Sequence, residues 1–159
     1  MRPMRRKDRA VTDPERINGV IAACSVCRLG FCDGAKPYVV PVNFGHAVES
    51  GRHVFYFHGA AEGRKADLIR QTGWACIEME EGYALRPAEA ACGYTAAFRS
   101  VIAEGPIAAV EDREEKRRGL TAVMRQATGR EDWTFPDAAV DAVCVLRLEA
   151  EALSCKEHL

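Results

Sequence analysis

The chain has 159 residues, of which 48% are hydrophobic and 28% charged, and its formal charge at pH 7 is -1. These values are ordinary for one globular domain, and the near-neutral charge argues against nucleic acid as a partner, because phosphates require a basic face. No apolar run approaches the roughly 20 residues of a membrane span, and no apolar segment follows the basic N-terminus as it would in a secretory signal.

Seven cysteines are a high count for such a chain. An odd number without a signal segment indicates reduced thiols in the cytoplasm and not a disulfide framework. The spacing of Cys24, Cys27 and Cys32 invites comparison with a zinc site, but the other cysteines stand alone. His46 and His53 are also too far apart for the usual histidine pair. We therefore favour free, buried or half-buried thiols over a structural metal, and expect a cytoplasmic protein without a metal site.

The N-terminal third begins with a basic segment, residues 1–11, which carries five basic side chains. We expect it to be a solvated tail or an arm that crosses to a partner. A helix should follow, because Thr12 or Asp13 can cap it and apolar residues then recur at helical spacing. A strand is expected near 25–31, with a turn at 33–34.

A long hairpin is expected next, from two runs rich in β-branched and aromatic residues, 38–44 and 53–58, joined through 49–52. Pro41 cannot donate a ladder hydrogen bond, so its strand should lie at a sheet edge or turn a barrel corner. The second strand leads into 59–65, where small residues precede an arginine and a lysine at a helix start. Backbone donors at a helix start, joined by two cations, indicate a phosphate site.

The remaining pattern alternates between strands and helices without a βαβ rhythm. Residues 81–92 fit either a loop or a short helix. The other expected elements are a helix over 63–72 ended by Gly73, strands over 74–80 and 94–103, a break or bulge at 105–106 with a continuation to 110, a helix over 111–126 that buries Leu120, Val123, Met124 and Ala127, an aromatic loop over 133–136 and a last strand over 140–148. About six strands with two or three helices suggest a mainly β, closed antiparallel barrel with peripheral helices.

Two segments resemble the signatures of a known family. Residues 54–68, VFYFHGAAEGRKADL, resemble the FMN-phosphate segment of the pyridoxamine 5'-phosphate oxidase-like, FMN-binding split-barrel proteins. Residues 98–105 are similar to their second signature, an R-[SQ]-V-x-x-x-G strand. The nitroimidazole-resistance (nitroimidazole reductase) branch is the most similar, and it also tends to start with a basic arm. The resemblance implies a basic arm over 1–11 and a single split β-barrel domain over 12–159.

The resemblance also implies a set of site residues. Arg64 and Lys65 would contact the FMN phosphate, with a solvated helix face as the alternative, and His58 would be the catalytic residue, with a structural histidine as the alternative. Ser100 would bond a flavin carbonyl or phosphate, and Arg99 would face the reduced flavin unless it is a surface arginine. The full expected cofactor-binding set is Val39, Val40, Pro41, Val42, Phe57, His58, Gly63, Arg64, Lys65, Arg99 and Ser100.

The expected function follows from the catalytic and binding motifs that the sequence contains and those that it lacks. The sequence has no hydrolytic motif, and flavin chemistry needs none because the cofactor carries the hydride. The tail 147–156 lacks the substrate-phosphate motif of pyridoxamine phosphate oxidases proper, so oxidation of vitamin B6 is not expected. The leading hypothesis is an FMN-dependent reductase of nitroaromatic or other small electron acceptors, and the alternative is a non-catalytic flavin- or heme-binding barrel. The resemblance also implies a homodimer with FMN at the subunit interface, covered by Trp133 and Phe135.

Overall fold

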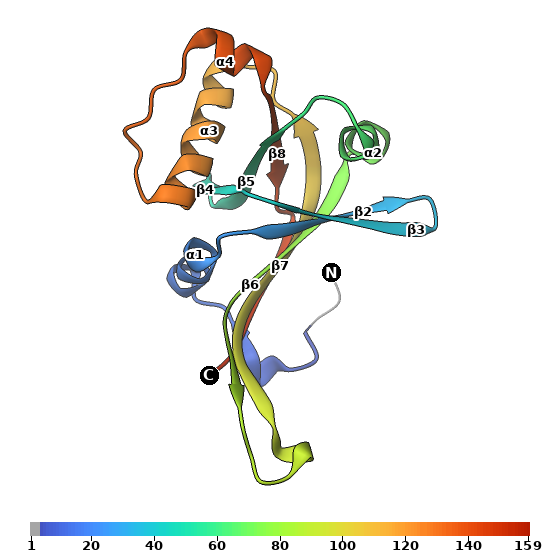
Figure 1. Ribbon diagram of the computed structural model, residues 1–159, viewed down its shortest axis with the longest axis vertical. Coiled ribbons are helices and arrows are strands. Elements are labelled where there is room, and N and C mark those ends of the chain that lie inside the picture. The colour runs from blue at the N-terminus through green and yellow to red at the C-terminus, as the bar shows by residue number, and fades with distance from the viewer. Residues whose placement is uncertain (1–3) are drawn as a thin grey trace.

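The computed structural model describes residues 4–159 and shows a mainly antiparallel β protein with a few helices (Figure 1). Its nine strands form one sheet that curls into a split barrel, in the order β3-β2-β6-β7-β8-β5-β4, with β9 paired to β1 and β7. The elements are η1 (Lys7–Arg9), β1 (Ala10–Val11), α1 (Pro14–Ala23), β2 (Cys27–Asp33), β3 (Lys36–Val42), β4 (Gly45–Glu49), β5 (Arg52–Gly59), α2 (Arg64–Thr72), β6 (Trp74–Arg86), η2 (Ala91–Gly93), β7 (Thr95–Ala109), α3 (Arg113–Thr128), α4 (Asp137–Ala142), β8 (Cys144–Glu149) and β9 (Ala152–His158). Among the described residues, no helix is both long enough and apolar enough to cross a membrane.

Strand β7 closes the barrel by changing partners along its length. It pairs with β9 through Phe98–Glu104 and then with β8 through Ile107–Ala109. The break or bulge predicted at 105–106 does not interrupt β7, which continues through it, but the neighbouring strand changes there from β9 to β8. The barrel interior is filled by apolar side chains such as Leu29, Ile77 and Val101, all with 0% exposure.

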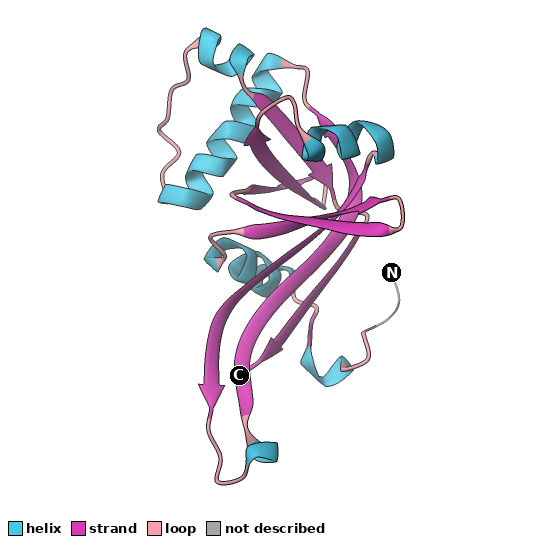
Figure 2. Cartoon of the chain, turned by 45° about the vertical axis from the view of Figure 1, so that its right-hand side comes forward, coloured by secondary structure: helices cyan, strands magenta, loops and turns pink. Residues whose placement is uncertain are grey.

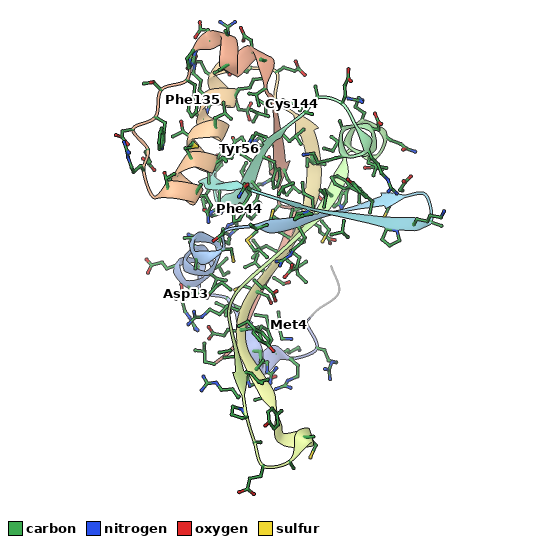
Figure 3. The ribbon with its side chains drawn as sticks, viewed as in Figure 1. Met4, Asp13, Phe44, Tyr56, Phe135 and Cys144 are labelled. Carbon is green, nitrogen blue, oxygen red and sulfur yellow. The ribbon has the colours of Figure 1, made fainter. Side chains whose placement is uncertain are left out.

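Helix α3 covers the outside of the barrel over β4, β5 and β8. A second apolar cluster lies beneath it, and Tyr56 points from β5 toward α3 (Figure 3). Asp112 caps the start of the helix by accepting a hydrogen bond from the Glu115 amide at 2.8 Å, and Gly129 ends it in the left-handed conformation. The predicted buried face is partly wrong. The buried residues are Gly119, Ala122 and Val123, since their small side chains allow the helix to approach the sheet closely. Ala127 is exposed.

The predicted hairpin between 38–44 and 53–58 is wrong in its pairing. Strand β3 pairs with β2 through a turn at 34–35, one residue beyond the predicted 33–34, and β5 pairs with a separate strand, β4. Ser50 and Gly51, with φ of 49° and 80°, form the tight turn between β4 and β5. Strand β3 does lie at a sheet edge, which confirms the inference from Pro41. The two runs look alike in sequence, and composition alone does not say which strand pairs with which.

Several strand boundaries also differ from expectation. The segment 81–86 extends β6 into a long ribbon with β7, and the tail forms β9, which was not predicted. Val140 lies in the short helix α4, so the last predicted strand begins only at Cys144. Residues 10–11 of the predicted basic arm are not a solvated tail, because they form β1 and pair with β9. Nine strands replace the expected six or so, while the class of fold is as predicted.

Candidate functional site

The start of α2 presents unpaired backbone donors to solvent. Gly63, at the N-cap position, adopts a φ of 105° and offers no side chain to the helix start. It is exposed, and a Cβ at this position would meet nothing within 4 Å. The first amides of a helix have no intrahelical acceptor and carry the positive end of the helix dipole. This helix start is therefore a candidate site for an anion.

Lys65 lies across the end of β5, beside this helix start. A Cβ on residue 59 would lie 2.9 Å from the Lys65 Nζ atom, so the ammonium occupies the space that Gly59 leaves free. Lys65 is half-buried, and no carboxylate of the described residues lies within salt-bridge distance of it. A fixed, unpaired cation beside an uncapped helix start strengthens the case for an anionic ligand.

Arg64 is held on the other side of the helix start by two residues of the β2–β3 hairpin. Its guanidinium lies 4.4 Å above the centre of the Tyr38 ring. Its Nε and Nη2 atoms donate to the Asp33 Oδ2 atom at 3.1 and 2.7 Å. Sequence reasoning did not assign Asp33 or Tyr38 to the site, and no local signal links Asp33 to a residue 31 positions away.

The four predicted residues of β3 divide between two faces of the sheet. Val40 and Val42 pack against the barrel core, whereas Val39 is 60% exposed and Pro41 is also exposed on the opposite face. Phe57 lies inside the core with 0% exposure. Because β3 is an edge strand, the backbone groups along its outer edge are available to a ligand.

Arg99 and Ser100 lie on β7, three strands away from β3, since β2 and β6 intervene. Arg99 donates to Glu81 at 2.7 Å and lines a hollow of about 320 Å³ between the sheet and α1. Ser100 projects from the other face of β7, where its register partners are Glu80 and Lys156. Within one chain, the structure does not bring these two residues to Arg64 and Lys65.

His58 lies one residue before the glycine that Lys65 covers. It is exposed and pairs in register with Val145 of β8. Strand alternation places its side chain on the same side of β5 as Tyr56, the side of α3, and opposite to that of Phe57. The aromatic loop is at a different place: Trp133 and Phe135 are half-buried, and Phe135 lies beside α3 (Figure 3).

The cysteines do not assemble into a candidate metal centre. Burial raises the pKa of the Cys24 and Cys27 thiols to about 12, so both are protonated at neutral pH, whereas Cys32 is exposed. A metal ligand must be a thiolate. Residues 4–159 contain no group of three or more potential ligands placed to hold a metal ion.

The fold is that of a split β-barrel protein, and the start of α2 is its candidate anion site. The family model for pyridoxamine 5'-phosphate oxidase matches residues 13–157, and the chain therefore belongs to that family. A crystal structure of a candidate 5-nitroimidazole antibiotic resistance protein from Bacteroides thetaiotaomicron is 30% identical. The match covers 93% of this chain and 86% of that one with a TM-score of 0.79.

More distant solved structures share the fold. The flavocytochrome Anf3 from Azotobacter vinelandii is 22% identical over 99% of this chain and 72% of its own, with a TM-score of 0.79. An FAD- and heme-binding protein from Mycobacterium smegmatis is 16% identical over 94% of this chain and 73% of its own, with a TM-score of 0.78. An uncharacterised protein of Rhizobium meliloti is 31% identical over 71 residues, which are 45% of this chain and 44% of that protein's length.

Proposed function

We propose that this protein binds FMN and reduces nitroaromatic or other small electron-accepting compounds. The observation that supports it best is the start of α2, where an uncapped helix, the unpaired Lys65 and the stacked Arg64 surround one space. These groups fit the terminal phosphate of FMN, which carries about two negative charges and accepts hydrogen bonds from backbone amides. Bound flavin would supply the two-electron chemistry. The resemblance to the nitroimidazole resistance protein supports the substrate class.

The proposed cofactor contacts extend from the phosphate site along β3. Arg64, Lys65 and the amides after Gly63 would hold the phosphate, and the free edge of β3 would offer backbone groups to the ring. Val39 and Ser100 project from one face of the sheet, whereas Val40 and Arg99 project from the other. We therefore propose that a second copy of the chain completes the site, which makes the protein a homodimer with FMN between its subunits. A cytoplasmic location stays a prediction.

His58 is the proposed catalytic residue. Its imidazole is exposed on the α3 side of β5, one residue before the glycine that Lys65 covers, and could donate from a ring nitrogen to the negative charge that develops on a nitro oxygen. An imidazole can also pass on a proton. The uncovered face of the bound flavin ring would then be the substrate site.

The cofactor part of the proposal is tested by substituting Lys65. Purified protein is denatured and the released cofactor identified, and the binding of FMN and of riboflavin is then titrated. Lys65→Ala should weaken FMN on the order of 10- to 100-fold, since a charge-assisted contact contributes roughly 1.5–3 kcal/mol. Riboflavin lacks the phosphate and should bind both forms equally. Lys7→Ala, at an exposed lysine outside the site, is the matched control. Unchanged FMN binding by Lys65→Ala would exclude this clamp, and a released heme would favour the alternative of a heme-binding barrel.

The catalytic part is tested by anaerobic reoxidation of the reduced protein with a 5-nitroimidazole. His58→Ala should keep its FMN but react on the order of 10²-fold more slowly, the usual contribution of a general acid. His58→Asn should recover part of the rate, because it keeps a donor but cannot shuttle protons. Wild-type rates in both variants would make His58 a structural residue, and no reoxidation even by the wild type would leave a non-catalytic flavin protein.

A further inference from the structure

Helix α2 borders a hollow that is separate from the candidate anion site at its start. The hollow has a volume of about 300 Å³ and lies between α2 and the ends of β7 and β8. The end of β7 passes beside α2 in both views of the chain (Figures 1 and 2). We call this hollow the α2 pocket. It is bounded by Ala66, Ile69 and Arg70 on the helix and by Ile107, Ala109 and Leu146 on the sheet.

The α2 pocket and the candidate anion site lie on different sides of the helix. Arg64 faces the β2–β3 hairpin, where it donates to Asp33. At 3.6 residues per turn, the three helical residues that border the pocket lie roughly 140–240° around the helix axis from Arg64. A ligand in the pocket therefore contacts another face of α2 than an anion at the helix start does.

The inner wall of the α2 pocket is apolar and held in place. Ile69 and Ile107 are 6% and 2% exposed and belong to the barrel core. The Ile107 amide donates to the Gly73 carbonyl at 3.0 Å, which ties the end of α2 to β7. Arg70 donates from its Nη1 atom to the Ala61 carbonyl at 3.1 Å, which ties the helix to the loop before it. The pocket is therefore preformed, as most small-molecule sites are.

Water has few hydrogen-bond partners inside the α2 pocket. The carbonyls of Gly73 and Ala61 already accept the bonds just described, and the half-buried Cys144 adds only a weakly polar thiol. Ordered water in a cavity needs two to four polar partners, so an apolar group that displaces poorly bonded water gains affinity. Ligand sites span roughly 300–1,000 Å³, and a pocket at the low end suits one aromatic ring or a short hydrocarbon chain.

A single cation stands at the mouth of the α2 pocket among the described residues that line it, and none of these is acidic. The Arg70 side chain is 61% exposed, and its Nη2 atom donates to Asp67 at 2.6 Å. The bonds to Asp67 and Ala61 use two of the five N–H donors of the guanidinium. Solvent screens the exposed pair with Asp67, so it competes only weakly with a ligand. The planar guanidinium matches a carboxylate better than any other anion that one ring or chain carries.

We infer that the α2 pocket binds a small apolar monocarboxylate, the size of a medium-chain fatty acid or an aromatic acid with one ring. Its carboxylate accepts hydrogen bonds from Arg70, and its hydrocarbon part lies against Ile69, Ile107 and Leu146. The pocket shares helix α2 with the candidate anion site but no residue, so this binding is independent of the proposed flavin function.

The test is methyl NMR of the isoleucine-labelled protein, as purified, during titration with octanoate and with 1-octanol, its neutral match. The methyl signals of Ile69 and Ile107 should shift with both ligands, and octanoate should bind more tightly. The signals of Ile17 and Ile102, which do not line the pocket, should stay in place. The octanoate titration is repeated with FMN in excess, and the shifts should be the same.

Three variants locate the two parts of the ligand. Arg70→Gln should weaken octanoate on the order of tenfold, because a charge-assisted contact is lost, and leave 1-octanol unchanged. Arg130→Gln is the matched control, since Arg130 is 60% exposed and also pairs with a nearby aspartate. Ala109→Leu enlarges a side chain at the exposed end of β7, beside Leu146 in register, and should weaken both ligands tenfold or more.

Three outcomes would overturn the inference. If neither methyl signal shifts up to the solubility limit of octanoate, the pocket is not a binding site. If Arg70→Gln and Arg130→Gln affect octanoate equally, Arg70 does not hold the carboxylate. If FMN abolishes the octanoate shifts, the carboxylate binds at the start of α2 instead. The methyl spectrum of each free variant checks that it is folded, and the flavin titrations are made separately, so failure of this site does not count against the cofactor.

Discussion

Two glycine-to-alanine substitutions should have opposite effects on stability, although the chemical change is the same. Gly105 lies where β7 passes the turn between β8 and β9. A Cβ on this residue would be 1.9 Å from the Glu149 carbonyl oxygen and 3.0 Å from the Glu151 amide nitrogen. Gly19 lies on the exposed side of α1, where a Cβ would meet nothing within 4 Å. Neither residue has a positive φ, so the difference is steric.

The expected magnitudes follow from these contacts. A Cβ essentially never approaches another atom within 3.0 Å, so Gly105→Ala must move the β8–β9 turn by about 1 Å. Overpacking costs about 1–3 kcal/mol, and weakening the adjacent hydrogen bond from the Glu151 amide to the Glu104 carbonyl adds about 1 kcal/mol. A loss of about 3 kcal/mol lowers the Tm of a chain of this length by about 6–12 °C. Gly19→Ala should raise the stability by about 0.5–1 kcal/mol through helix propensity.

Thermal and urea unfolding of the two variants and the wild type, at one fixed protein concentration, would measure both effects. The concentration is fixed because any association makes Tm depend on it. If Gly105→Ala unfolds at the wild-type midpoint, the close approach of the turn to β7 is not as described. If Gly19→Ala lowers the midpoint, the exposed face of α1 carries a contact that the structure does not show.

Three further predictions concern other contacts. Burial lowers the pKa of His46 to about 4 and also lowers that of His53, so their contribution to stability is complete above pH 6.5 and declines as the pH falls toward 4. The part due to His46 is at most about 3 kcal/mol, which urea unfolding at several pH values would measure. His46→Asn should lose that part and keep only the smaller dependence due to His53. The Tyr56 hydroxyl donates to the Glu49 carboxylate at 2.8 Å, so Tyr56→Phe should lower the free energy of unfolding by about 1–2 kcal/mol in the same assay. No change would mean that water replaces the hydrogen bond. Asp33→Asn removes the carboxylate that pairs with Arg64 and should increase the affinity for FMN about fivefold, with the affinity for riboflavin and the stability almost unchanged. Weaker FMN binding would show that Asp33 positions Arg64 and does not compete with the phosphate for it.

The sequence by itself determined those features whose physical cause is local. Gly63, Arg64 and Lys65 mark a helix start with cations, and the helix begins there because a flexible glycine precedes a run of helix formers. Gly73 and Gly129 end their helices because an αL residue closes the last turn at little cost. Pro41 placed its strand at an edge because it lacks an amide hydrogen.

Only the tertiary structure decided which segments meet. Strand β3 reads like a partner for β5, but β-branched runs are interchangeable in sequence, and the barrel pairs it with β2. The contact between Arg64 and Asp33 exists because the β2–β3 hairpin extends beneath α2. No pattern of apolar residues in the sequence predicts this arrangement. A surface shared by several strands was likewise hidden in the sequence. Val39, Ile102 and their neighbours are spread over five strands, and only the register of the sheet gathers them on one side. Local propensity depends on adjacent residues, whereas a surface depends on the packing of the whole chain.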